Sequence, residues 1–112
     1  MQARVLTILA GLLALPLAAT AETWKNVPVI DTLCLAKVKA DPDSHTKACA
    51  LQCAKGGYGL LTEGGAYLKF DQAGNDKTVA ALKATKKTDH LRATVEGTRE
   101  GDTVKVQSVA LD

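Results

Sequence analysis

Aromatic residues are scarce in this sequence, and its positive and negative charges nearly balance. One Trp, one Phe and two Tyr make up 4% of the 112 residues, and 14 basic side chains face 12 acidic ones, a net charge of +2. Binding to nucleic acid needs a basic field for the phosphates and, for single strands, aromatic platforms for the bases. We therefore expect no nucleic acid as a partner. We expect the four aromatic residues in the core and at its rim: Trp24, Tyr58, Tyr67 and Phe70.

Several short motifs with a known chemistry are also absent. The chain has no C-x-x-C pair, which removes the knuckle of common zinc sites, the thioredoxin motif and covalent haem attachment. Its glycine-rich stretch at 56–59 lacks the Lys-Ser/Thr of a phosphate-binding loop. Internal repeats and low-complexity segments are missing as well. What remains is a chain whose chemistry is concentrated in three cysteines and one nearby histidine.

Charged residues are absent between Arg4 and Glu22, and the run VLTILAGLLALPLAA between them is apolar. It ends in Ala-Thr-Ala at 19–21, a small-x-small pattern typical of signal-peptidase cleavage. Pro16 interrupts the run and a polar chain follows it, so we expect no membrane insertion after cleavage. Residues 1–21 are therefore predicted to be a removed signal peptide. The mature protein should reside in the periplasm or be secreted.

The predicted mature chain, residues 22–112, has 91 residues (112 minus 21), enough for one small domain. Without Arg4 it carries 13 basic and 12 acidic side chains. A domain of this size has a modest core, so a covalent or metal cross-link would add substantially to its stability.

The sequence predicts the element order strand, helical insertion, hairpin, helix, hairpin. Alternating apolar residues indicate the strands, and capping residues and glycines indicate where the helices begin and end. The predicted elements are a strand at Thr23–Asp31, a helix from Ser44 to Lys55, strands at Tyr58–Thr62 and Ala66–Asp71, a helix capped by Asn75 and ending near Lys87, and strands at His90–Glu96 and Asp102–Leu111.

Two irregularities are predicted within the strands. Pro28 cannot donate a ladder hydrogen bond, so the first strand should lie at an edge there or contain a bulge. The apolar phase of the last strand shifts after Val106, which indicates a bulge near Gln107-Ser108. We expect Gly97 to Gly101 to form the last turn. One group of apolar side chains should be buried together: Leu68, Phe70, Leu91, Val95, Val104 and Val106.

Apart from the insertion, this order is β-β-β-α-β-β, which is that of a small OB-like five-stranded barrel. The prediction is a mainly β domain with a helical insertion after strand 1 and a helix between strands 3 and 4. An open α+β sheet is the alternative. Barrel closure also removes exposed sheet edges, which suits a small secreted β protein.

The three cysteines, Cys34, Cys49 and Cys53, cannot all pair within one chain in an oxidising compartment. Cys49 and Cys53 would be neighbours on one helix face with nearly parallel Cα–Cβ bonds, a poor disulfide geometry. Cys34 should therefore be one partner of a disulfide. The closed loop would span 15 residues to Cys49 (49 minus 34) or 19 to Cys53 (53 minus 34). Either bond would contribute about 3 kcal/mol by chain entropy.

A metal site is the second interpretation of the same residues. Three thiolates and the imidazole of His45 suit zinc, or copper(I) because sulfur is a soft ligand. His45 and Cys53 lie about 12 Å apart if both are inside one helix, so His45 can join only if the helix begins after it or bends. Asp31 is a further candidate ligand, or it caps the end of its strand.

Thiol chemistry is the third interpretation. His45 precedes Cys49 by one turn near a helix N-terminus, where a thiolate is favoured. The C-x-x-x-C spacing is not that of thioredoxin, however, and no second histidine or acid is placed to orient His45.

The pattern Asp31-x-x-Cys34, then His45-x-x-x-Cys49-x-x-x-Cys53-x-x-Gly-Gly, resembles that of small exported bacterial domains of unknown function. In those domains the signature precedes an OB-like hairpin, and the resemblance covers nearly all of residues 22–112. It implies export and an OB-like fold, and it implies no particular activity.

These observations together predict a small periplasmic binding or accessory domain without enzymatic activity. Its Cys/His cluster would act as a disulfide staple or as a soft-metal (Zn or Cu(I)) site. A thiol-based periplasmic redox protein is the alternative.

Overall fold

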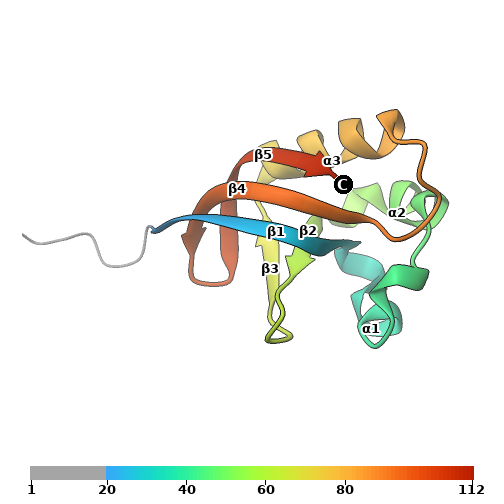
Figure 1. Cartoon of the computed structure of the whole chain (residues 1–112), viewed down its shortest axis with the longest axis horizontal. Coiled ribbons are helices and arrows are strands. Elements are labelled where there is room, and N and C mark those ends of the chain that lie inside the picture. The colour runs from blue at the N-terminus through green and yellow to red at the C-terminus, as the bar shows by residue number, and fades with distance from the viewer. Residues whose placement is uncertain (1–19) are drawn as a thin grey trace, which may run out of the picture.

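The computed structural model describes residues 20–112, which form a closed five-stranded β-barrel with the strand order β1-β2-β3-β5-β4 (Figure 1). Neighbouring strands are antiparallel except β3 and β5, which are parallel. The predicted OB-like barrel is confirmed, and the alternative of an open sheet is wrong because the sheet closes. The strands are β1 (Thr20–Asp31), β2 (Tyr58–Leu61), β3 (Tyr67–Phe70), β4 (Arg92–Glu100) and β5 (Thr103–Leu111).

The connection between β1 and β2 contains two short α-helices, α1 (Leu35–Val38) and α2 (Lys47–Gln52), and three 3₁₀ helices, Thr32–Cys34, Pro42–Ser44 and Ala54–Gly56. One continuous helix over Ser44–Lys55 was expected, and this is wrong. His45 has an extended backbone, and Thr46 caps α2 by accepting a hydrogen bond from the Cys49 N–H at 3.2 Å. The helix therefore begins after His45, and it ends before Cys53.

Strand β1 pairs with two neighbouring strands. Its first part pairs with β4, and its last three residues pair with β2, with Val29 opposite Leu60. The pairing with β4 slips between Trp24 and Val27, where Asn26 adopts a positive φ of 52°. The predicted irregularity beside Pro28 is thus confirmed as a bulge.

Helix α3 (Gln72–Ala84) lies against β5 along one side of the barrel (Figure 1). It was expected to be capped by Asn75, and this is wrong, because Asp71 accepts the hydrogen bond from the Gly74 N–H at 2.9 Å. Gly74 lies inside the helix, where an added Cβ would come within 2.5 Å of Val106 Cγ2. The glycine permits close packing here, and it does not break the helix.

The β4–β5 hairpin is longer than predicted. Gly97 was expected to begin the turn, but it lies within β4 opposite Val106, and the turn contains Gly101 and Asp102. The predicted bulge is confirmed, since Glu96 pairs with Ser108 and the next residue pairs with Val106, which leaves Gln107 as the extra residue.

The core fills the barrel and extends beneath α3. All six apolar residues predicted to be buried together belong to it. Tyr58 and Phe70 are buried, and Trp24 packs against the core from its rim, as expected for the aromatic residues. Within residues 20–112, no helix is both long and apolar enough to cross a membrane. The predicted signal peptide falls almost entirely on residues 1–19, outside the described residues.

Candidate cysteine and aspartate–histidine site

The end of β1 and the insertion that follows it bring the chemically active side chains together. Asp31 is the last residue of β1, and it caps the 3₁₀ helix that ends at Cys34. Cys53 directly follows the last residue of α2 as its C-cap, and His45 lies in the extended link before α2. The insertion occupies the end of the barrel away from the β4–β5 turn (Figure 1).

Two of the three cysteines face each other. Cys34 Sγ lies 3.8 Å from Cys53 Sγ, and both residues are half-buried. Cys49 is exposed, and its thiol is not part of the donor group formed by the other two. Of the two pairings open to Cys34, the structure therefore juxtaposes the one with Cys53.

A buried acid–histidine pair lies beside the two sulfurs. Asp31 is 0% exposed and His45 is 4% exposed. Asp31 Oδ1 accepts a hydrogen bond from His45 Nε2 at 2.5 Å, and its Oδ2 accepts one from the Cys34 N–H at 3.0 Å. A buried carboxylate needs such donors, because leaving it unpaired is costly. His45 therefore holds Asp31 in place from one side while the 3₁₀ turn holds it from the other.

The Cys34 thiol is strongly disfavoured as a thiolate. Burial, which is the largest cause, together with the nearby Asp31 carboxylate and the Cys53 thiol, raises the pKa of this thiol to about 12. A reactive cysteine needs the opposite environment, one that stabilises negative charge.

Asp31, Cys34 and Cys53 together form a group of potential metal ligands. Their donor atoms, one carboxylate oxygen and two sulfurs, all lie within 4.8 Å of one another. The sequence predicted His45 and Cys49 as the further ligands beside Cys34 and Cys53. Within the described residues, the group contains Asp31 instead. His45 bonds to this group through Asp31, so the expectation that no acid is placed to orient His45 is wrong.

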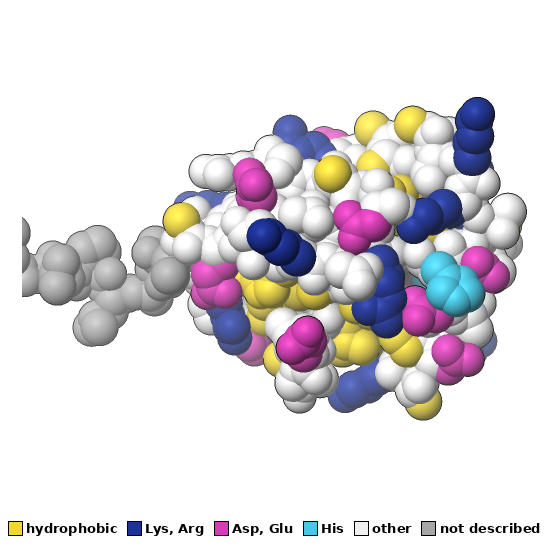
Figure 2. Space-filling model, in the orientation of Figure 1, with side chains coloured by type: hydrophobic (Ala, Val, Ile, Leu, Met, Phe, Trp, Pro, Cys, Tyr) yellow, Lys and Arg dark blue, Asp and Glu magenta, His cyan; other side chains and the backbone are white. Residues whose placement is uncertain are grey.

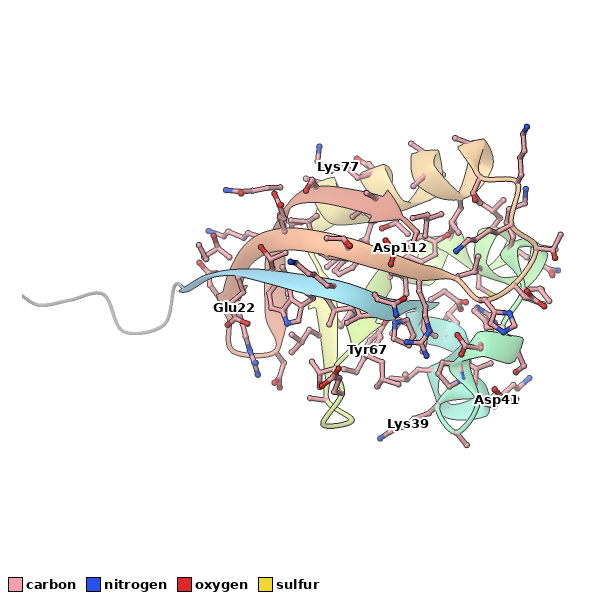
Figure 3. All side chains as sticks on the ribbon, viewed as in Figure 1. Glu22, Lys39, Asp41, Tyr67, Lys77 and Asp112 are labelled. Carbon is pink, nitrogen blue, oxygen red and sulfur yellow. The ribbon has the colours of Figure 1, made fainter. Side chains whose placement is uncertain are left out.

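The hydroxyls of two tyrosines hold the elements around this site together by hydrogen bonds. Tyr67, labelled in Figure 3, lies on β3. It donates a hydrogen bond to the Ile30 carbonyl at 2.9 Å, and its hydroxyl lies 3.1 Å from that of Thr32. Tyr58 donates to the Ala50 carbonyl at 2.7 Å, which ties β2 to α2. Burial raises the pKa of both phenols to about 12, so both remain neutral donors.

The insertion is also tied to the barrel by an arginine that sequence reasoning missed. Arg92 donates two hydrogen bonds to the Asp43 carboxylate, at 2.9 and 3.1 Å, and a third to the Asn26 carbonyl at 3.0 Å. The bonds to Arg92 hold the pKa of Asp43 below its usual value. Nothing in the local sequence of either residue indicates the pair, because they are 49 positions apart.

A groove of about 450 Å³ lies between the β1 bulge and the β2–β3 turn. An adjoining hollow of about 470 Å³ shares four of its lining residues, including Val27 and Glu63. Figure 2 shows hydrophobic surface near the centre of this face. The four shared residues are Lys25, Val27, Thr62 and Glu63. They combine basic, apolar, neutral polar and acidic side chains.

Comparison with protein-family models, with curated proteins and with solved structures finds no match for this chain. The proposals below therefore depend on the chemistry and placement of its own residues.

Proposed function

We propose that this chain is a small exported binding or accessory domain, without enzymatic activity, in which Cys34 and Cys53 form a disulfide staple. The observation that carries the proposal is the Sγ–Sγ distance of 3.8 Å between two half-buried cysteines from different elements. A disulfide has its sulfurs about 2.0 Å apart, so the two side chains would rotate towards each other to form it. Export would place them in a compartment where such bonds form and persist.

Bond formation would be an exchange with a disulfide-bearing partner. The Cys34 and Cys53 thiols lose two protons and two electrons, the bond between their sulfurs forms, and the partner's disulfide is reduced to a dithiol. The product closes a loop of 19 residues (53 minus 34) around the insertion.

The insertion is a segment that a disulfide would stabilise. Its α-helices contain four and six residues, lengths too short to be stable in isolation. Its other ties to the rest of the chain are mostly polar, including the Asp43–Arg92 pair and a hydrogen bond from Lys47 Nζ to the Thr85 carbonyl at 3.0 Å. A disulfide would fix the insertion to the end of β1.

The redox alternative has less support. The raised pKa of Cys34 means that this sulfur is a poor attacking group in its reduced form. The fixed barrel beside a cross-linked insertion instead suits passive binding, and the groove between β1 and the β2–β3 turn offers a surface for it.

The test is the intact mass of protein exported by living cells, before and after alkylation under denaturing conditions without reductant. We expect a chain that begins at Glu22, lacks two hydrogens and takes up one alkyl group, on Cys49. Peptide mapping should join Cys34 to Cys53. Three alkylated thiols, or a bond that joins Cys34 to Cys49, would overturn the staple. A chain that begins at Met1 would overturn export.

A further inference from the structure

The spacing of the two sulfurs also suits a tetrahedral metal ion. Zinc binds thiolate sulfur at about 2.3 Å, so two sulfurs at the tetrahedral angle are about 3.8 Å apart. Cys34 Sγ and Cys53 Sγ are 3.8 Å apart. An ion between them would occupy the same space that a disulfide closes.

A third donor lies close to this position. A carboxylate oxygen of Asp31 lies within 4.8 Å of both sulfurs. Asp31 and Cys34 are also held to each other through the bond from the Cys34 N–H to Asp31 Oδ2. The Asp31 carboxylate and the backbone of Cys34 are thus held together before any ion arrives, and the third donor comes from Cys53, directly after α2.

His45 supplies the support that ligands to a metal usually have. Its Nε2 bonds to Asp31 Oδ1 and limits the rotation of the carboxylate. Such outer hydrogen bonds orient metal ligands and strengthen binding. An ion with two positive charges would also compensate the charge of Asp31, which is 0% exposed and, within the described chain, pairs with no basic side chain other than His45.

The donor set distinguishes between the soft metals. Copper(I) favours sulfur alone, whereas zinc accepts sulfur and carboxylate oxygen together. Both cysteines are half-buried, so an ion could enter from solvent and keep a water as its fourth ligand.

We propose that, while its cysteines are reduced, the chain binds one Zn²⁺ ion through Cys34, Cys53 and Asp31, with His45 positioning Asp31. Binding releases the two thiol protons to solvent. The inference goes beyond the staple, because it concerns the reduced chain. The staple and the zinc site use the same two sulfurs and exclude each other.

The experiment is a zinc titration of the reduced, metal-free mature protein, without oxygen, in competition with a chromophoric chelator. Co²⁺ serves as a second probe, because thiolate ligation and tetrahedral geometry give it characteristic absorption bands. We expect one Zn²⁺ per chain. We expect affinity to fall about tenfold or more in Cys34→Ser, Cys53→Ser and Asp31→Asn, and Cys49→Ser, the matched control, to bind like the wild type.

Circular dichroism of each variant separates loss of the site from loss of the fold. Cys53→Ser, which changes only one half-buried sulfur, keeps the test decisive if Asp31→Asn does not fold. The proposal is overturned if the reduced wild type binds no zinc, if it binds only Cu(I), or if Cys49→Ser loses affinity while Cys34→Ser keeps it. Because the staple is tested on oxidised protein exported by cells, failure of the zinc site leaves the staple standing, and the reverse also holds.

Discussion

Asp31 connects more of this site than any other single residue. It ends β1, caps the turn that carries Cys34, and accepts a hydrogen bond from His45. Because the carboxylate is fully buried, each of these donors offsets part of its desolvation. The position of Cys34 relative to the barrel therefore depends on a polar contact, and that contact depends on His45.

Replacing His45 by Ala should destabilise the protein by about 1–3 kcal/mol, because it removes one of the donors to a buried carboxylate. In the double variant that also carries Asp31→Asn, the loss should be smaller than the sum of the two single losses. Urea unfolding of the four proteins measures this coupling. His90→Asn is the control, since His90 is exposed and Asn tolerates its positive φ of 51°. Strictly additive losses would contradict the role of the pair.

Stability should also fall at alkaline pH. Burial raises the pKa of Tyr67 from 10.0 to about 12, so between these values the folded chain keeps a proton that the unfolded chain releases. This contribution to stability is complete below pH 10 and is lost as pH rises towards 12.

Thermal unfolding from pH 8 to pH 11 checks this expectation. Tyr67→Phe should melt lower than the wild type at pH 8, because it lacks the bond to the Ile30 carbonyl. Its melting temperature should then fall less steeply with pH. A slope equal to that of the wild type would show that Tyr67 contributes nothing to the alkaline loss.

At the scale of elements, α3 and the β4–β5 hairpin illustrate how packing decides what local sequence leaves open. Gly74 lies in the first turn of α3, where its missing side chain lets the helix approach Val106 and Phe70. Gly97 has the same role in β4, where an added Cβ would come within 2.5 Å of the Lys105 carbonyl oxygen. From the sequence, both glycines resemble residues that end a helix or strand. In the structure, both lie inside such an element.

Gly74→Ala should therefore destabilise the protein by about 1–3 kcal/mol, although alanine is the better helix former by about 1 kcal/mol. The new Cβ would lie 2.5 Å from Val106 Cγ2 and 2.8 Å from Phe70 Cβ. Gly64→Ala is the matched control, because its nearest neighbour would be Thr62 Oγ1 at 3.9 Å. Chemical unfolding measures both. A Gly74→Ala protein as stable as the wild type would show that α3 can shift away from β5.

The same elements show how far the sequence alone could lead. Alternation in Leu91–Val95, the Gly64-Gly65 hairpin signal and the phase shift in β5 were sufficient to predict the core residues and the bulge, because strands have a period of two. The start of α3 could not be predicted, because Gly74 is explained only by its neighbour Val106 across space. One helix was predicted over Ser44–Lys55, because these residues favour helix and nothing local shows that His45 is bound to Asp31.

The cysteine pairing could likewise be predicted only in part from the sequence. Helix geometry alone indicated that Cys34 should face α2. The choice of Cys53 over Cys49 depends on where α2 ends, which only the folded insertion defines.

At the scale of the whole molecule, the barrel and the insertion differ in how much core they contain. The barrel closes through five strands and has a continuous core, whereas the insertion contributes to that core mainly through Ala50, Leu51 and Ala54. Loop-closure entropy makes a cross-link over such a segment effective, since it removes conformations that only the unfolded chain can adopt. The central claim is that this cross-link joins Cys34 to Cys53.

Thermal unfolding of non-reduced mature protein tests this claim most directly. Cys34→Ser and Cys53→Ser should each lose about 3 kcal/mol, which for a domain of this size lowers the melting temperature by about 10–20 °C. The double variant should be little worse than either single one, and Cys49→Ser should melt like the wild type. If Cys34→Ser melts like the wild type, or if Cys49→Ser shows the large loss and Cys53→Ser does not, the Cys34–Cys53 staple is contradicted.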